Sequence, residues 1–336
     1  MTENASATFY TVCDDKYFPG LVGLLNSLRL MGHDEPLVVG DCGLTAIQRK
    51  LLASHCTLFE LPRNILESPQ NHKPFPFLLK PRGTVVFIDS DMIVTKNLSA
   101  ALTAAEEGKV CAFPDPEHDR WFAEWREVFG LSSAPRRQTY VCSGFVAFST
   151  TRWANLLERW WEACGRIASL PGYQEGAPPL APYAQTDQDA LNALLMSELP
   201  SDALSLLPVD EQVFPWHFNR VNSVDADALV CQYMGRQPSI LHTPFRPKPW
   251  MSRGVQRHVY LRFLRRLLTA PDVALSVPPR LLDIWLRRGF ASELACYGLS
   301  FTNMLANKYH PKRTARSLLR RLQKTSPQSV MTAPGS

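Results

Sequence analysis

The sequence predicts an α/β protein in which a Rossmann-like, mixed but mostly parallel sheet is flanked by helices, with a basic helical extension at the C-terminus. Strand and helix signals alternate over the first 115 residues, which is typical of a parallel sheet covered on both faces. After residue 253 the pattern changes to helical spacing with an excess of Arg and Lys. With 336 residues, 45% of them hydrophobic, the chain can bury one large core.

Five short β-rich or apolar runs in the first part of the chain predict strands, and three stretches between them predict helices. Within residues 18–31, four leucines between positions 21 and 28 fall on one helical face. Thr45 is suited to cap a second helix at 46–53, and Asn97 or Ser99 to open a third. The strands are expected at residues 7–13, 37–39, 57–61, 84–88 and 110–113.

The rest of the chain is less regular. Residues 115–139 lack periodicity, which in a compact domain is typical of a functional loop. We expect a strand at 141–149, a helix at 152–168, a loop at 171–182, and a helix capped by Thr186 that runs to 197. Short strands are expected near 205–207, 228–231 and 239–241, and helices from 254 to 324. We therefore divide the chain into a catalytic domain (1–252), a basic helical region (253–324) and a disordered tail (325–336).

Charge, hydropathy and cysteine spacing narrow the cellular location that we expect for the protein. Residues 253–324 hold fifteen Lys and Arg but three Asp and Glu, so the net charge of +5 hides an acidic body. No apolar stretch approaches the roughly 20 residues of a membrane span, and the N-terminus lacks the features of a secretory signal. The eight cysteines form no C-x-x-C pair, which favours reduced, buried thiols. We expect a cytoplasmic protein, with peripheral attachment to the inner face of the membrane as an alternative.

The clearest chemical feature follows the apolar run at 84–88. Asp89 and Asp91 come directly after it, separated only by Ser90. Ligands of open α/β sheets bind beyond the carboxyl ends of the strands, and two carboxylates there would repel each other without a cation. A hard divalent ion such as Mg²⁺ or Mn²⁺ fits, because it prefers oxygen ligands and bridges to phosphate. A solvated acidic turn is the simpler alternative.

Two further segments carry polar groups suited to the same chemistry. The Pro-stiffened stretch 241–250 contains His242, Arg246 and Lys248, which could supply a metal ligand and positive charge for a phosphate, or could form an ordinary surface loop. At the expected helix start, Asp187, Gln188 and Asp189 could cap the helix or orient a substrate.

In this order, the motifs resemble the family 8 glycosyltransferases, retaining enzymes of the GT-A fold that include glycogenin and bacterial lipopolysaccharide galactosyl- and glucosyltransferases. The resemblance covers residues 7–250. It comprises an opening strand and nucleotide-binding loop, a lysine sixteen residues before the first metal-binding acid, a D-x-D metal motif, a strand that resembles N-[AS]-G, a D-Q-D segment, and an ending that resembles H-F-x-G-x-x-K-P-W. The matching residues here are Thr11, Asp14, Tyr17, Lys73, Asp89, Ser90, Asp91, Ser143, Gly144, Asp187, Gln188, Asp189, His242 and Lys248.

The resemblance implies transfer of a hexose from a nucleoside-diphosphate sugar, UDP-linked, to a glycan, a glycolipid or another hydroxyl acceptor. Asp89, Asp91 and His242 would hold Mn²⁺ or Mg²⁺, which would act as a Lewis acid on the diphosphate. Lys248 would add positive charge to the departing diphosphate, and Asp14 would hold the base or ribose. The sugar would be faced by Lys73, Asp187 and Gln188, the latter two as orienting groups without a covalent nucleophile.

Three positions depart from the family pattern. Cys142 stands where the family has Asn, so a sugar contact there is in doubt, and Thr243 and Phe245 replace Phe and Gly near the pyrophosphate. For the acceptor, we expect sugar rings to stack on aromatic residues of 115–139 and 171–185, namely Trp121, Phe122, Trp125 and Tyr183.

The arginines of the basic region alternate with apolar residues. They favour either an anionic membrane surface or a helical cap with a solvated basic face, and we expect no nucleic-acid partner. Two functions compete with sugar transfer. One is a non-enzymatic nucleotide-sugar-binding scaffold. The other is a sugar nucleotidyltransferase, which the acidic loop after the first strand disfavours because that enzyme class carries a Gly-rich basic loop there.

Overall fold

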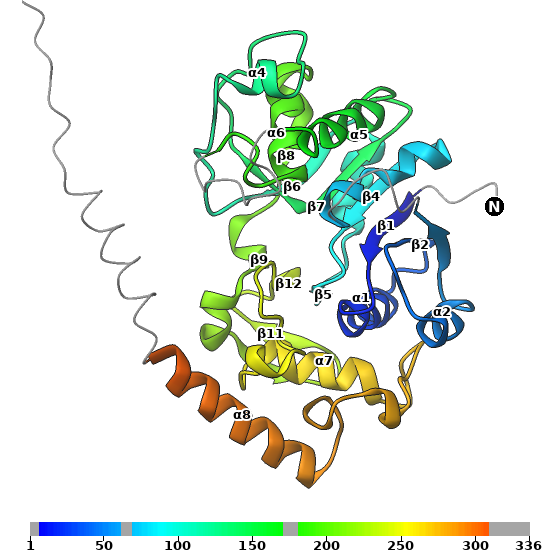
Figure 1. The fold of residues 1–336 in the computed structure, drawn as a ribbon, viewed down its shortest axis with the longest axis vertical. Helices are drawn as coiled ribbons and strands as arrows, with labels where there is room; N and C mark the ends of the chain where they lie inside the picture. The colour runs from blue at the N-terminus through cyan, green and yellow to red at the C-terminus, as the bar shows by residue number, and fades with distance from the viewer. Residues whose placement is uncertain (1–6, 62–68, 171–180, 309–336) are drawn as a thin grey trace, which may run out of the picture.

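A computed structural model describes residues 7–61, 69–170 and 181–308, and it is built around a seven-stranded sheet (Figure 1). The strand order is β3-β2-β1-β4-β7-β6-β8, and only β7 runs antiparallel to its neighbours. The expected mixed, mostly parallel sheet is therefore confirmed. Its strands are β1 (Ala7–Cys13), β2 (Leu37–Asp41), β3 (Thr57–Glu60), β4 (Thr84–Ile88), β6 (Val110–Pro114), β7 (Val141–Ser149) and β8 (Leu204–Leu206).

Helices cover both faces of this sheet and define two cores. Alternate residues of β4 point to opposite faces: Val86 joins one apolar cluster, whereas Val85 and Phe87 join the other. The first cluster is covered by α1 (Phe18–Leu30), α2 (Ala46–Leu52), α3 (Ser99–Glu106) and α7 (Val259–Thr269). The second is covered by α4 (Trp125–Val128), α5 (Leu156–Ile167) and α6 (Asp187–Ser197).

Two small sheets lie beside the main one. A three-stranded sheet has the order β5-β12-β9, from β5 (Met92–Val94), β12 (Ile240–His242) and β9 (Gln212–Val213). A hairpin-like pair joins β10 (Asn222–Asp225) to β11 (Val230–Gln232). Because β5 follows β4 after only three residues, the three-stranded sheet attaches the Pro-rich second half of the chain to the carboxyl end of β4.

Most expected elements of the first 200 residues are present, with local differences at their ends. Thr45 caps α2 in a capping box with Gln48, as expected. The expected 152–168 helix begins only at Leu156. Thr186 does occupy the position before α6, but its side chain makes no capping hydrogen bond, so that prediction is wrong. Part of the expected loop at 171–182 lies outside the described residues.

The prediction of continuous helices from 254 onward is only partly right. The chain forms α7 and α8 (Phe290–Lys308), but the stretch between them holds 3₁₀ turns. Pro271, Pro278 and Pro279 explain the interruption, because proline lacks the amide donor and blocks the preceding turn. The Asn26 amide of α1 donates to carbonyls of Leu267 and Leu275, which ties this region into the main core. The proposed division at residue 252 stays a prediction, and residues 309–336 lie outside the described part.

His258 caps α7 and makes the stability of this region depend on pH. Its Nδ1 accepts from the Leu261 amide, and its ring packs 5.0 Å from that of Phe218. Burial lowers the pKa of His258 from 6.5 to about 4. Between these two pKa values the unfolded chain therefore binds more protons than the folded chain does. The free energy of unfolding falls as the pH drops through this window, by about 3 kcal/mol at most.

Urea unfolding at pH 7 and pH 4.5 measures this loss. A His258→Asn variant keeps a capping oxygen but has nothing to titrate, so its loss of stability over the same range should be smaller than that of the wild type. Equal losses in the two proteins would contradict the assignment to His258.

Candidate metal centre and surrounding site

Asp89 and Asp91 lie in a tight turn that joins β4 to β5 at the carboxyl end of β4. The Asp89 amide donates to the Gly144 carbonyl at 2.8 Å, and the Met92 amide donates to the Asp89 carbonyl at 3.0 Å. The first bond extends the β4–β7 pairing by one residue, and the second closes the turn in which β4 leaves the main sheet. Both carboxylates are thereby held at the sheet edge where ligands of open α/β folds bind.

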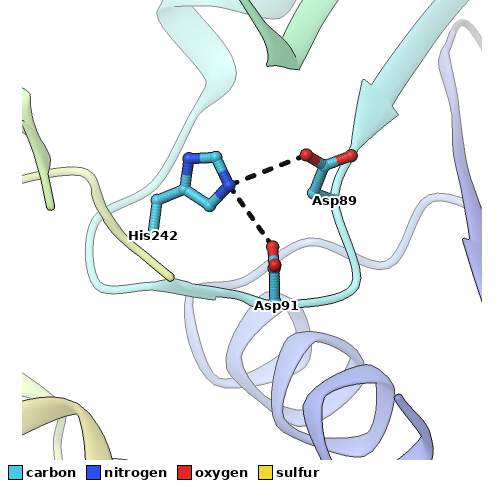
Figure 2. A group of neighbouring side chains, drawn as sticks. All are labelled: Asp89, Asp91 and His242. Atoms are coloured by element: carbon cyan, nitrogen blue, oxygen red, sulfur yellow. Dashed lines mark ion pairs between the residues drawn. The ribbon is translucent and has the colours of Figure 1, made fainter. Parts of the chain in front are cut away.

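His242 reaches the two carboxylates through the three-stranded sheet. β12 pairs antiparallel with β5, and the register sets His242 opposite Met92, the residue after Asp91. Its Nε2 lies 3.6 Å from Asp89 Oδ2 and 3.3 Å from Asp91 Oδ1, and Figure 2 shows the ring edge facing both acids. Three side chains from distant segments thus converge, as the sequence predicted.

This cluster fits a divalent cation. One ligand atom from each residue lies within 4.8 Å of the others, which is close enough for one ion to contact all three. Asp91 Oδ1 and His242 Nε2 are buried and have no hydrogen-bond partner among the described residues. A side chain at Gly144 would place its Cβ 2.8 Å from His242 Cε1 and 3.0 Å from Asp89 Oδ2, so glycine keeps the space clear. The two oxygens and one nitrogen suit Mn²⁺ or Mg²⁺.

The electrostatics of the cluster also favour a cation between the acids. Burial alone would lower the pKa of His242, but its contacts with Asp89 and Asp91 outweigh burial and raise it well above 6.5. Burial would raise the pKa of both carboxyls, yet Lys73 beside Asp89 and Lys248 beside Asp91, together with His242, lower both. The site therefore keeps both acids ionised.

Lys248 is buried behind Asp91. Its Nζ donates to Asp91 Oδ2 and to the Thr243 carbonyl, and it lies 5.0 Å from the centre of the Tyr17 ring. Gly254 permits the tight packing of this loop, because a Cβ there would overlap the Lys248 carbonyl. Lys248 thus adds positive charge directly at Asp91.

Lys73 joins Asp89 to the D-Q-D segment. Its Nζ lies 2.8 Å from Asp89 Oδ1 and 2.9 Å from Asp187 Oδ2. The same Nζ donates to the hydroxyl of Ser143 at 3.1 Å, and that hydroxyl donates to Asp187 at 2.7 Å. Burial alone would lower the pKa of Lys73, but Asp187 and Asp89 raise it, so the ammonium stays charged.

The start of α6 presents Asp187 and Gln188 to this site. Thr186, just before them, has φ of 48°, an unusual backbone conformation for a β-branched residue. Gln188 Oε1 accepts from the Ser143 amide, and its Nε2 donates to Asp115 Oδ2 at 3.0 Å. Asp115, which the sequence analysis missed, follows β6 directly, and burial raises the pKa of its carboxyl.

Asp189 plays a different part from its two neighbours. It is fully buried and accepts two hydrogen bonds from Arg120, each of 2.7 Å, and one from the Tyr140 hydroxyl at 2.8 Å. All of these contacts lie within the core behind α6. Asp189 therefore anchors the helix start and does not face the metal centre.

Of the expected nucleotide-binding residues, Thr11 lies in β1, and Asp14 and Tyr17 lie between β1 and α1. Asp14 Oδ1 accepts from the amides of Lys16 and Tyr17, so it fixes the turn itself. The Tyr17 hydroxyl accepts from Arg246 Nε at 3.2 Å. Thr11 is buried, and its hydroxyl has no partner among the described residues. Ser90 approaches α1 closely, because Gly20 offers no Cβ to meet its carbonyl.

The aromatic residues expected to stack on acceptor sugars differ in burial, and stacking by Trp121, Phe122 and Tyr183 stays a prediction. Trp125 is fully buried and donates from Nε1 to the Pro182 carbonyl, so the prediction that it stacks on an acceptor sugar is wrong. Trp121 and Phe122 are half-buried beside cations: Arg137 lies over the Trp121 ring and Arg120 over the Phe122 ring.

Comparison with known proteins supports the fold. No protein-family model and no curated protein sequence matches this chain. Among solved structures it resembles WbbM, a bifunctional glycosyltransferase, at 17% identity over 81% of this chain with a TM-score of 0.56. It spans only about half of WbbM, 51%. It resembles an active-site mutant of LgtC at 16% identity over 81% of this chain and 98% of LgtC, with a TM-score of 0.53.

A third similar structure is the glycosyltransferase GlyE of Streptococcus pneumoniae TIGR4, at 15% identity over 79% of this chain and 60% of GlyE, with a TM-score of 0.50. All three identities are low, so these likenesses concern the fold alone. The expected fold class is confirmed: this chain has the GT-A-type α/β fold of these glycosyltransferases.

Proposed function

We propose that this chain is a metal-dependent glycosyltransferase. It moves a hexose from a nucleoside-diphosphate sugar, UDP-linked, to a hydroxyl of a glycan or glycolipid, with retention of the anomeric configuration. The observation that carries this proposal is the convergence of Asp89, Asp91 and His242 at the carboxyl end of β4. The fold shared with known glycosyltransferases supports it.

Asp89, Asp91 and His242 would hold Mn²⁺ or Mg²⁺. When bound, such an ion supplies Lewis-acid charge for the diphosphate leaving group. Lys248, buried against Asp91, keeps that carboxylate ionised and adds positive charge on the same side of the site. Asp14, Tyr17 and Thr11 would form the nucleotide side, together with Ser90 of the metal turn.

The sugar side of the site lies around Lys73 and the start of α6. Lys73 holds Asp89 and Asp187 together, so the metal-binding acids and the D-Q-D acid keep a fixed separation. Gly144 on β7 leaves room beside Asp89 and His242, and Gln188 is oriented by Ser143 and Asp115. We assign Asp187 and Gln188 the role of orienting the donor sugar and the incoming hydroxyl.

Hydrolysis of UDP-sugars without an acceptor separates this proposal from a binding scaffold. A panel of UDP-hexoses with Mn²⁺ should reveal at least one that raises the melting temperature and is slowly hydrolysed, with both effects lost in EDTA. A scaffold would show the stabilisation without hydrolysis, and a sugar nucleotidyltransferase would release sugar phosphate in the presence of pyrophosphate. A chain that no UDP-sugar stabilises would overturn the proposed donor.

We further propose that the enzyme acts at an anionic membrane surface, to which α8 attaches it peripherally from the cytoplasmic side. Figure 1 places α8 at the edge of the molecule, beyond α7. The small side chains of Ser292 and Cys296 face inward, whereas the large apolar side chains are exposed. They recur at helical spacing along one face, as Phe290, Leu294, Tyr297, Phe301, Met304 and Leu305.

The flanking charge favours an anionic membrane over another partner. Arg287 and Arg288 precede α8, and residues 309–324 contain six Lys and Arg but no acid. Within α7, by contrast, Arg265 and Arg266 are held by Glu293 and Asp272. The exposed apolar face of α8, more than the arginines of α7, is therefore the surface we assign to the membrane. Within the described residues, no helix is long and apolar enough to cross a bilayer.

A Leu294→Ser/Phe301→Ser variant should bind vesicles of phosphatidylglycerol and phosphatidylcholine at least about 10-fold more weakly than the wild type. The reason is that each large apolar side chain contributes about 1.5–3 kcal/mol when fully buried, and interfacial burial recovers part of that. Co-sedimentation measures the effect.

An Ile47→Ser/Val224→Ser variant is the matched control, because these two residues are equally exposed but lie on α2 and β10. It should bind vesicles as the wild type does. Two outcomes would contradict a membrane role. One is that the α8 variant binds vesicles as well as the wild type does. The other is that the α8 substitutions instead abolish a dimer that the wild type forms in gel filtration.

A further inference from the structure

The ring nitrogen of His242 that faces away from the two acids, Nδ1, contacts the buried side-chain amide of Gln212. Gln212 Nε2 lies 3.1 Å from His242 Nδ1, on the side of the ring away from Asp89 and Asp91. Gln212 is 3% exposed, and its Oε1 is buried without a hydrogen-bond partner among the described residues. Cys142 completes this contact, with its Sγ 3.7 Å from Gln212 Nε2 and 4.0 Å from His242 Nδ1.

The strand register explains why Gln212 faces His242. β9 runs parallel to β12 and pairs Gln212 with Ile240, two residues before His242. Side chains two residues apart on a strand share a face, so Gln212 and His242 point to the same side of the three-stranded sheet. The Phe214 ring is centred 5.5 Å from that of His242. The imidazole is buried, and its neighbours besides the two acids include Gln212, Cys142 and Phe214.

A histidine that binds a metal through Nε2 carries its proton on Nδ1 and needs an acceptor there. A side-chain amide can donate from its nitrogen or accept at its oxygen, and a half-turn of the Gln212 amide exchanges the two groups at His242. The 3.1 Å contact between Gln212 and Nδ1 suits either arrangement of the amide, since the donor in it depends on which ring nitrogen carries a proton. With a metal on Nε2, the oxygen of the turned amide would accept a hydrogen bond from the Nδ1–H group.

We infer that Gln212 is a positioning residue for the metal centre: it holds the His242 ring and accepts a hydrogen bond from Nδ1–H when Nε2 binds the ion. Cys142, where the resemblance leads us to expect Asn, packs against the same ring edge and leaves the amide of Gln212 as the stronger partner. This inference rests on the proposed metal site, and it assigns a function to a residue that no sequence motif marks.

Mn²⁺ affinity of the apoprotein, without donor or acceptor, tests this role. A Gln212→Leu variant should bind Mn²⁺ about 10- to 100-fold more weakly in calorimetry, the range found when such supporting partners are removed. Gln212→Glu, which supplies an acceptor only, should restore most of the affinity. Gln237→Leu is the matched control: Gln237 donates to the Thr95 carbonyl beside the same small sheet but does not touch His242. It should bind Mn²⁺ as the wild type does.

A measurement on the wild type keeps the inference testable where Gln212→Leu fails to fold. With ¹⁵N-labelled histidine and diamagnetic Zn²⁺, the His242 resonances should show Nδ1 protonated and Nε2 bound to the ion. A deprotonated Nδ1 in the bound state, or full Mn²⁺ affinity in folded Gln212→Leu, would overturn the role of Gln212. A wild-type chain that binds no divalent ion would instead overturn the metal site itself, and this inference with it.

Discussion

Replacement of Asp91 by Asn is expected to abolish measurable Mn²⁺ binding and to lower the rate of UDP-sugar hydrolysis by at least about 100-fold. The amide has nearly the same size but no charge, so the site loses one of two anionic ligands. The change also leaves the buried ammonium of Lys248 without its carboxylate partner, so positive charge faces the position of the ion. Calorimetric titration with Mn²⁺ measures the first effect and product release measures the second.

Two companion variants separate loss of the metal from loss of the fold. His242→Ala removes the third ligand without exposing a buried charge, and it should reproduce the loss of binding with a smaller fall in melting temperature. Asp189→Asn changes an equally buried acid that contacts Arg120 and Tyr140. It should lower the melting temperature yet retain Mn²⁺ affinity. Normal Mn²⁺ binding by Asp91→Asn would contradict the proposed site.

The first half of the site could be predicted from the residues themselves. An uninterrupted apolar run followed by two acids indicates a buried strand with a ligand site at its carboxyl end. The sequence shows both features because they are contiguous. The position of His242 could not be derived in this way. It depends on the pairing of β12 with β5 across about 150 residues of chain, and only the order of the family motifs indicated it.

The residues that the sequence analysis missed are those whose partners are distant. Asp115 reaches Gln188, Gln212 reaches His242, and the Tyr260 hydroxyl donates to the Asp91 carbonyl at 3.0 Å. No local pattern marks any of them, since each is a single polar residue beside an ordinary element. The error at Trp125 has the opposite cause: a loop position suggested exposure, but α4 folds that side chain into the second core.

The prediction for the C-terminal region was only partly right. The excess of arginine favoured either an anionic membrane surface or a helical cap with a solvated basic face, but charge counts do not show which cations have partners nearby. Arg265 donates to the Arg287 carbonyl and to Glu293, so these charges hold the region together. What remains exposed on α8 is apolar, and its i, i+4, i+7 spacing could have been found from the sequence alone.

Replacement of Lys73 by Met is expected to cost about 3–5 kcal/mol of unfolding free energy and to abolish hydrolysis of UDP-sugars. Methionine has a side chain of similar length but no charge. The substitution therefore leaves Asp89 and Asp187 facing each other without the cation between them, and Asp187 is buried. Urea unfolding at pH 7 gives the stability loss. Lys73→Arg should not restore activity, because the planar guanidinium is larger than the ammonium that fits between the two acids and Ser143.

A double-mutant cycle with Asp187→Asn tests whether this loss comes from the uncompensated charge. If Lys73 mainly neutralises the two acids, Lys73→Met/Asp187→Asn should be more stable than Lys73→Met alone, because one of the stranded carboxylates is gone. Both the single and the double variant should remain inactive, because no ion pair then fixes the distance between Asp89 and the D-Q-D segment. Strictly additive stability losses would show that Lys73 and Asp187 act independently, and that their 2.9 Å contact does not connect the metal side of the site to the sugar side.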